Sequence, residues 1–321
     1  MSVFTTTSAK PLLPREIAAG LIKDTQAASV VSRLSGAEPM RFGNVDYLVF
    51  NDIPKAEFVE EGGEKSATKA GFTSVSATPH KAQVTMRFSE EVQWADEDYQ
   101  LGILETLSSA GAEALARALD FGVIHAINPL SGAKVGSWTN YIGASTKIVE
   151  HKATGGADAD DDFRAAVGLL VNQTKPVAIT GAALDPAFAW DLASLKVKDG
   201  AGATSQPRYP NLGFGTNVTN FLGLACAQSN TVSGRPEAAD TKVRAIVGDW
   251  AGGLRWGIQR DIPVSVINRG DPDGQGDLAR KNQIALRLEI VYGWYVFTDK
   301  FALVKDATAG AEESSEPEGE Q

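Results

Sequence analysis

The feature that most constrains the fold is a long hairpin pattern that runs from Val45 to Phe88. Val45–Phe50 is rich in β-branched and aromatic residues, and the return arm alternates polar and apolar side chains from Lys81 to Phe88. The segment between the arms, Glu57–Lys65, is too polar to form a core. A lone two-stranded ribbon is marginal in water, because ordering each backbone residue costs about 1–2 kcal/mol. We therefore expect the hairpin to need support from outside itself.

The hairpin also carries large apolar residues toward its tip, where no core can cover them. These residues are Phe50, Ile53, Phe58, Val59 and Phe72. Exposed apolar patches mark interaction surfaces in soluble proteins. The pattern predicts an assembly protein, in which another subunit covers the hairpin.

Composition limits the remaining possibilities. With 321 residues, 43% of them hydrophobic, the chain is long enough for two domains with real cores. Its net charge of −10 argues against a nucleic-acid binder, which would concentrate lysine and arginine to neutralise phosphates. No stretch approaches the roughly 18 continuous apolar residues of a membrane helix, and the N-terminus lacks a signal-peptide pattern. We expect neither membrane insertion nor secretion.

The single cysteine and the C-terminal tail also lead to expectations. Cys226 has no partner for an intrachain disulfide, and its apolar neighbours predict a buried, inert thiol. The tail, residues 306–321, holds five glutamates after Ala309 and no basic residue. Such a composition cannot bury enough apolar area to order a segment, so disorder is expected from Asp306 onward. A solubilising end is preferred to a docking segment.

Periodicity and capping residues predict a mixed α+β order of elements. The expected helices are Pro14–Gly36, Glu97–His125, a segment that follows Asp158–Asp162, and Asp185–Leu195. The expected strands after the hairpin are Val177–Thr180, Val243–Val247, Ile262–Ile267 and Ile284–Phe297, and Lys198–Ser205 is expected to be a flexible surface loop.

Several local strings, in this order and spacing, resemble the HK97-type major capsid proteins of tailed double-stranded DNA phages. The strings are Ala56–Glu64 and Phe88–Glu91 around the hairpin, then Val247–Trp250, Trp256–Ile258 and Lys281–Arg287. Each string is a soft pattern, and the specificity lies in their sequence order. The resemblance covers the chain from about Leu13 to Lys305.

The resemblance implies an α+β, HK97-like capsid fold. Its parts would be an N-terminal arm and helix at 1–44, an extended hairpin (the E-loop) at 45–84, a peripheral domain with a spine helix at 85–155 and 279–305, an axial α/β domain at 156–278, and the acidic tail at 306–321. The long helical predomain that serves some relatives as a fused scaffold is not seen. The resemblance therefore implies either a separate scaffolding protein or none.

By the same resemblance, the chain would be a structural, non-enzymatic protein that forms pentamers and hexamers of an icosahedral shell around a double-stranded DNA genome. It would be made and assembled in the host cytoplasm, reside in the virion, and enclose DNA without sequence-specific binding. Portal and decoration proteins would be its other partners. Two alternatives stay open: an encapsulin-type nanocompartment shell, and an oligomeric α/β enzyme with a dimerisation arm.

The candidate site is the charged tip of the hairpin. Its charged residues are expected to form salt bridges on a neighbouring subunit, and they are Glu57, Glu60, Glu61, Glu64, Lys65 and Lys69. The alternative is a solvated tip. Some relatives cross-link subunits through an E-loop lysine, a role that the resemblance allows for Lys65 or Lys69 but that we do not favour.

No catalytic, cofactor or metal site is predicted. The three histidines, His80, His125 and His151, lie on dissimilar segments without cysteines at zinc spacing. The Asp271–Asp277 loop places Asn282 where a calcium loop of the EF-hand type needs glutamate. The acids of Asp158–Asp162 fit a helix N-terminus. The turn at Gly181–Asp185 lacks the glycines of a nucleotide-binding loop.

Overall fold

The computed structural model describes residues 29–50, 56–67, 71–91, 97–152, 158–199, 202–260 and 264–307. The chain forms two compact units. Unit 1 is built on Ala37–Leu115 and Arg255–Tyr295, and unit 2 on Ala116–Leu254 with residues 24–36 and the segment from Val296. These units are defined by contacts within the chain, whereas the predicted domains come from the resemblance, so the domain assignment stays a prediction. No described helix has the length and apolar character to span a membrane.

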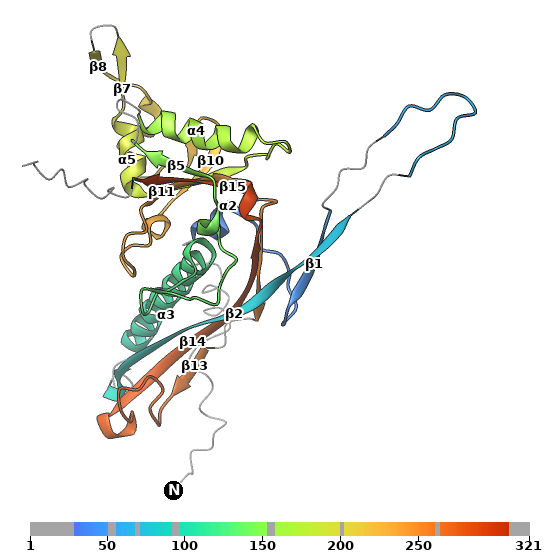
Figure 1. Ribbon diagram of the computed structural model, residues 1–321. Coiled ribbons are helices and arrows are strands. Elements are labelled where there is room, and N and C mark those ends of the chain that lie inside the picture. The colour runs from blue at the N-terminus through green and yellow to red at the C-terminus, as the bar shows by residue number, and fades with distance from the viewer. Residues whose placement is uncertain are drawn as a thin grey trace, which may run out of the picture. The chain divides into compact units, whose positions relative to one another are not determined.

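Unit 1 centres on an antiparallel sheet whose strands follow the order β1, β2, β14, β12, with β13 also paired to β14 (Figure 1). The bounds are β1 (Val45–Phe50), β2 (Phe72–Ser89), β12 (Leu254–Arg260), β13 (Val264–Ile267) and β14 (Gln283–Val296). The predicted hairpin is confirmed, as is the long C-terminal strand. The strand expected at Ile262–Ile267 corresponds to β13, and its first two residues lie outside the described part. Strand β12 was not predicted.

Strand β2 has two different partners along its 18 residues. Its outer third, Phe72–Ala77, pairs with β1, and the rest pairs with β14 in a continuous register from Thr78↔Trp294 to Ser89↔Gln283. The support that was expected from outside the hairpin therefore comes, for its inner part, from β14 of the same chain and not from another subunit. Only the outer ribbon with its tip lacks a third strand among the described residues.

Helix α3 (Glu97–Asp120) confirms the predicted long helix and spans about 36 Å. Within unit 1, its backbone approaches the sheet at Gly111, where an added Cβ would stand 2.1 Å from Leu288 Cδ1 and 3.2 Å from Met86 Cε. The Tyr292 hydroxyl donates a hydrogen bond to the Leu115 carbonyl at 3.1 Å. Glycine at this position therefore allows the helix to lie directly on β2 and β14. The last turn of the helix predicted at Glu97–His125 is a π-helix, Phe121–His125, that belongs to unit 2.

Unit 2 contains a six-stranded mixed sheet in the order β5, β15, β11, β6, β10, β9. The bounds are β5 (Ile148–His151), β6 (Gly181–Leu184), β9 (Asn220–Phe221), β10 (Leu224–Gln228), β11 (Val243–Gly248) and β15 (Phe301–Asp306). Helices α4 (Ala159–Val171) and α5 (Pro186–Ser194) contribute to its core, in which Phe163, Leu170, Phe188 and Leu192 are almost completely buried. Both helices were predicted, and Asp185 caps α5 through the Ala187 amide at 2.9 Å.

Two local predictions in unit 2 are wrong. The strand expected at Val177–Thr180 lies instead at Gly181–Leu184, as β6. The small residues of β6 fit a crowded core, because a Cβ at Gly181 would lie 3.2 Å from the Ala225 carbonyl oxygen. The expected loop Lys198–Ser205 lies within a hairpin of β7 (Lys196–Asp199) and β8 (Gly202–Pro207). The two remaining short strands, β3 (Ile127–Asn128) and β4 (Ala133–Lys134), pair with each other.

The disorder predicted for residues 306–321 begins too early. Asp306 is the last residue of β15, its amide donates to the Lys242 carbonyl at 2.9 Å, and its carboxylate accepts from Arg244 Nε at 2.8 Å. Composition could not reveal these long-range partners. Residues 308–321 lie outside the described part.

A buried carboxylate fixes the first described helix, α2 (Val30–Leu34), in unit 2. Asp120 is completely buried and accepts hydrogen bonds from the Ser29 hydroxyl and from the Val30 and Val31 amides at 2.5–3.1 Å. The Thr231 hydroxyl adds a fourth at 2.8 Å. The end of α3 therefore satisfies the free amides at the start of α2. The prediction of one continuous helix at Pro14–Gly36 is wrong, because Ser29 is extended and caps a short helix that ends at Leu34. The residues up to 28 lie outside the described part.

We predict that Gly111→Ala lowers the free energy of unfolding by about 1–3 kcal/mol, because the new methyl group overlaps the buried Leu288 side chain. Urea unfolding of the purified subunit, followed by tryptophan fluorescence, measures the effect. The matched control is Gly168→Ala in α4, whose Cβ would meet nothing closer than 3.7 Å. This control should be neutral or stabilising by up to about 1 kcal/mol. Equal stability of the two variants would contradict the close packing of α3.

Candidate assembly interface

The tip of the hairpin, Ala56–Ala67, is closed by its own hydrogen bonds. Glu57 accepts from the Ser66 amide at 2.6 Å and from the Ser66 hydroxyl at 2.5 Å, and these bonds lower the pKa of its carboxyl. The Gly63 amide donates to the Glu60 carbonyl at 2.9 Å, with Gly62 at φ +83°. A positive φ at this position of a tight turn favours glycine. The tip is thus a defined loop.

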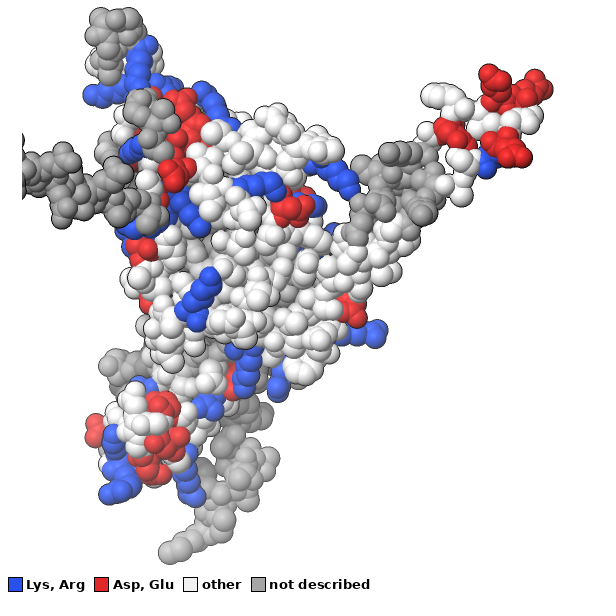
Figure 2. Space-filling model, viewed as in Figure 1, with Lys and Arg blue, Asp and Glu red and all other residues white. Residues whose placement is uncertain are grey.

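The tip is acidic and fully open to solvent. Four glutamates and one lysine give it a net charge of −3, and Figure 2 shows them as a red cluster with one blue group. Every residue from Ala56 to Ala67 is exposed, including Phe58, whose side chain contacts nothing that would cover it. The structure brings five predicted site residues into this one loop: Glu57, Glu60, Glu61, Glu64 and Lys65. Lys69 lies outside the described residues.

The ribbon that carries the tip has one apolar exposed face. Leu48 is 78% exposed and Phe72 is 62% exposed. Side chains alternate along a strand, so Leu48 lies on the same face as position 50, and position 50 is paired with Phe72. Leu48 and Phe72 therefore share one face. The exposure predicted for Phe58, Val59 and Phe72 is confirmed. Nothing is described of the Phe50 side chain, and Ile53 lies outside the described residues.

The base of the ribbon is anchored within unit 1. The Tyr47 hydroxyl donates to Glu38 Oε2 at 3.2 Å, and Glu38 also pairs with Arg255. Burial and the neighbouring Glu38 raise the pKa of Tyr47 to about 12, so the phenol stays protonated as a donor. The ribbon therefore leaves the sheet at a fixed base, and its outer part consists of β1 paired with the end of β2.

The Asp271–Asp277 loop is an anchored structural loop. Arg87 on β2 donates to both carboxylate oxygens of Asp273 and to Asp271 Oδ1, the last at 2.9 Å. Arg87 Nη2 also pairs closely with Asp273. The Arg87 bonds lower the pKa of Asp273. Sequence reasoning rejected a calcium loop here but missed the arginine, which lies far away in the sequence.

The acidic cluster of α4 is neutralised by cations. Asp158, Asp160 and Asp161 lie close enough together to suggest a metal site, but Arg208 binds Asp158 at 3.0 Å and Asp160 at 2.8 Å. Lys198 also pairs with Asp158 at 2.8 Å. Asp158 and Asp161 form a capping box at the start of the helix. The interpretation as a helix N-terminus fits this geometry.

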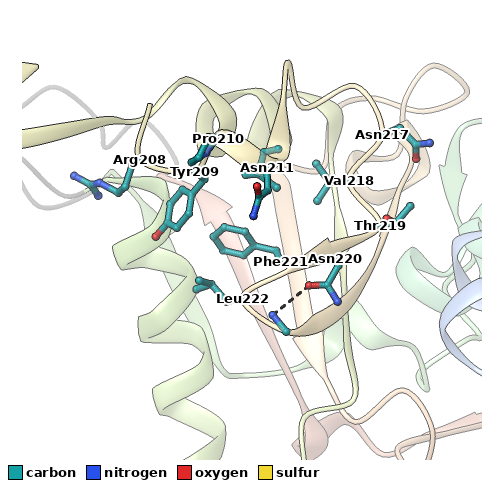
Figure 3. Close-up of a pocket in the computed structure, with 12 residues that line it drawn as sticks. Arg208, Tyr209, Pro210, Asn211, Asn217, Val218, Thr219, Asn220, Phe221 and Leu222 are labelled. Carbon is teal, nitrogen blue, oxygen red and sulfur yellow. Dashed lines mark hydrogen bonds between the residues drawn. The ribbon is translucent and has the colours of Figure 1, made fainter. Parts of the chain in front are cut away.

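A hollow in unit 2 has a volume of about 540 Å³ and is shown in Figure 3. Its lining bears on the enzyme hypothesis. Tyr209 lies edge-on to Phe221 with 5.1 Å between ring centres, and Asn220 accepts from the Gly223 amide at 3.2 Å. The lining residues include no histidine, cysteine or carboxylate. They therefore offer no pair of nucleophile and general base.

The three histidines serve packing and hydrogen bonding in separate places. Burial lowers the pKa of His80, which stacks on Trp294, and of His125, which bonds the Thr231 carbonyl, to about 4 in each case. Both are therefore neutral at neutral pH. His151 lies between Asp162 at 2.9 Å and Asp191 at 3.2 Å and links β5 to α4 and α5.

Comparisons with known proteins identify the class. The model of the Phage capsid family matches residues 9–305. A solved chain from Mycobacterium phage Ogopogo is 43% identical, with a TM-score of 0.76 over 87% of this chain and 92% of that one. A chain from Gordonia phage Cozz is 30% identical, with a TM-score of 0.75 over 87% of each chain. No curated protein matches.

A more distant similarity shows the fold alone. It is to a structure titled "Capsid of empty GTA particle computed with C5 symmetry", at 15% identity and a TM-score of 0.58 over 96% of each chain. The family match covers most of the sequence, so the chain belongs to the phage capsid family. It is a structural major capsid protein of the HK97 type that forms the capsid shell of a virion, and it is not an enzyme. The resemblance inferred from the sequence is confirmed.

We predict that Cys226 resists thiol reagents in the folded protein. Its side chain is buried beside β6, and burial raises the pKa of the thiol to about 11. At pH 8 the reactive thiolate is therefore scarce and shielded. Ellman's reagent should label Cys226 slowly in the native protein and rapidly in guanidinium chloride. Equally fast labelling in both conditions would contradict the buried position.

Proposed function

We propose that this capsid protein forms pentamers and hexamers that tile an icosahedral shell around a double-stranded DNA genome. The observation that supports this proposal is the outer ribbon with its tip, which exposes Phe58, Phe72 and Leu48 in the single chain. An isolated subunit gains little by ordering such a ribbon. A neighbouring subunit that covers it would supply the missing contacts, and a closed shell repeats that contact in every copy.

The tip is proposed to lie on this neighbour through its charged residues. Each exposed ion pair contributes only about 0–1 kcal/mol, so the charges mainly set the register of the contact. We assign residues 85–155 and 279–305 to a peripheral domain and 156–278 to an axial domain, as the family resemblance implies. Portal and decoration proteins, and a separate scaffolding protein if one is used, remain proposed partners.

The acidic composition supports a shell that encloses DNA without gripping its sequence, since phosphate binding requires concentrated lysine and arginine. The encapsulin alternative shares the fold but encloses a protein. The two most similar solved chains cited above come from phages, which favours a genome as the content. Electron microscopy of particles isolated with their contents would separate the two. Contents that nuclease digests only after the shell is opened support DNA, and protein cargo supports the alternative.

We predict that Glu60→Lys with Glu61→Lys impairs shell assembly while the subunit stays folded, because both residues are fully exposed on the tip. Sedimentation and electron microscopy measure assembly, and circular dichroism measures folding. The matched control reverses Glu90 and Glu91, which follow the end of β2 away from the tip, and changes the net charge equally. Normal assembly of the tip variant would leave the solvated-tip interpretation as the better one.

A further inference from the structure

Unit 1 has a groove on the face of its sheet that α3 does not cover. Met86 and Leu288 lie against Gly111 of α3, and side chains alternate along a strand, so the odd-numbered residues of β2 and β14 face the other way. The groove is on that opposite face and has a volume of about 260 Å³. Its lining includes Phe42, Pro79, Lys81, Arg260, Glu289 and Val291.

The groove combines an apolar wall with cations at its edge. The wall is formed by Pro79, Val291 and Phe42, which is 71% exposed. Lys81 and Glu289 pair with each other at 2.8 Å across the sheet. Arg260 and Arg41, which precedes Phe42, are exposed and have no acidic partner among the described residues. Lys81 and Glu289 offset each other, so Arg260 makes the lining net positive, and Arg41 adds a second cation beside Phe42 in the sequence.

The tip has the complementary properties. It presents the aromatic ring of Phe58 on a loop whose shape is defined by its turn and by the Glu57–Ser66 hydrogen bonds. The loop carries a net charge of −3. In the single chain the ring is fully exposed, so the tip does not occupy the groove of its own subunit. The ribbon residues Phe72–Ala77 alone carry the chain about 17 Å outward from the sheet, and Figure 1 shows the tip beyond β1.

We propose that the tip of one subunit inserts Phe58 into this groove on a second copy, with Glu60 and Glu61 facing Arg41 and Arg260. This inference rests on the proposed function, in which the tip lies on a neighbour, and it adds the receiving surface. The aromatic ring supplies the buried area, and the opposite charges orient the loop. Both parts belong to the same polypeptide, so every subunit in a closed shell would give one tip and receive another.

A reciprocal charge reversal tests the pairing. Three full-length variants are compared with the wild type: E60K/E61K in the tip, R41E/R260E in the groove, and the four changes combined. Each double variant is expected to reduce the yield of shells by about tenfold, because like charges then meet across the interface. The combined variant is expected to recover most of the yield, since the attraction is restored with opposite signs. Arg269→Glu, an exposed arginine of unit 1 outside the groove, is the control.

Phe58 is tested separately, because its exposure means that substitution cannot disturb a core. Phe58→Ala should reduce shell yield, and Phe58→Leu should retain more of it than the alanine variant. Circular dichroism and gel filtration of each unassembled variant establish that the subunit is folded. For a groove variant that does not fold, Phe42→Ala is the substitute, since its side chain is mostly exposed.

The outcomes separate this inference from the proposed function. If the tip variant loses assembly and the groove variant assembles normally, the groove is not the receiving site. The proposed contact of the tip with a neighbour would still stand, and the groove would have a different occupant. Normal assembly of both double variants would overturn the groove as the receiving site and also the contact of the tip with a neighbour. Loss in both without recovery in the combined variant would overturn the pairing. Recovery supports it.

Discussion

The organisation of unit 1 depends on one strand, β2, that serves two structures at once. From Thr78 to Ser89 it pairs with β14 and belongs to the body of unit 1, and from Phe72 to Ala77 it is half of a two-stranded ribbon with β1. The first part is fixed by a long antiparallel register and by α3, which approaches at Gly111. The second part takes its direction from the first. A protruding arm can therefore leave a stable body without a hinge in the strand.

This arrangement explains how a structural protein can present an arm that it cannot itself stabilise. The base is held by Tyr47, Glu38 and Arg255, whereas the outer ribbon exposes Leu48 and Phe72. Exposed apolar area on an arm is a liability in a monomer and a binding surface in an assembly. In the proposed assembly the body folds through its own contacts, and the arm joins copies.

Much of the local architecture could be predicted from the sequence, because it depends on short-range periodicity. The alternation in β2, the apolar stripe of α3 with Leu115 and Leu119, and the cap of α5 at Asp185 all lie within a few residues of what they specify. The charged tip could be predicted as well. The predictions failed where long-range packing overrides local propensity: the small residues of β6 resemble a turn but fill a crowded core at Gly181.

The sequence by itself determined the existence of the hairpin, the long helix and the acidic loop, because each is specified by neighbours along the chain. Only the tertiary structure decided that Arg87 would hold the Asp273 loop and that Asp120 would cap a helix some ninety residues away. It also decided that Phe42, Val291 and Arg260 would share one groove. Contacts between residues far apart in sequence arise from strand register and packing, and no local pattern encodes them.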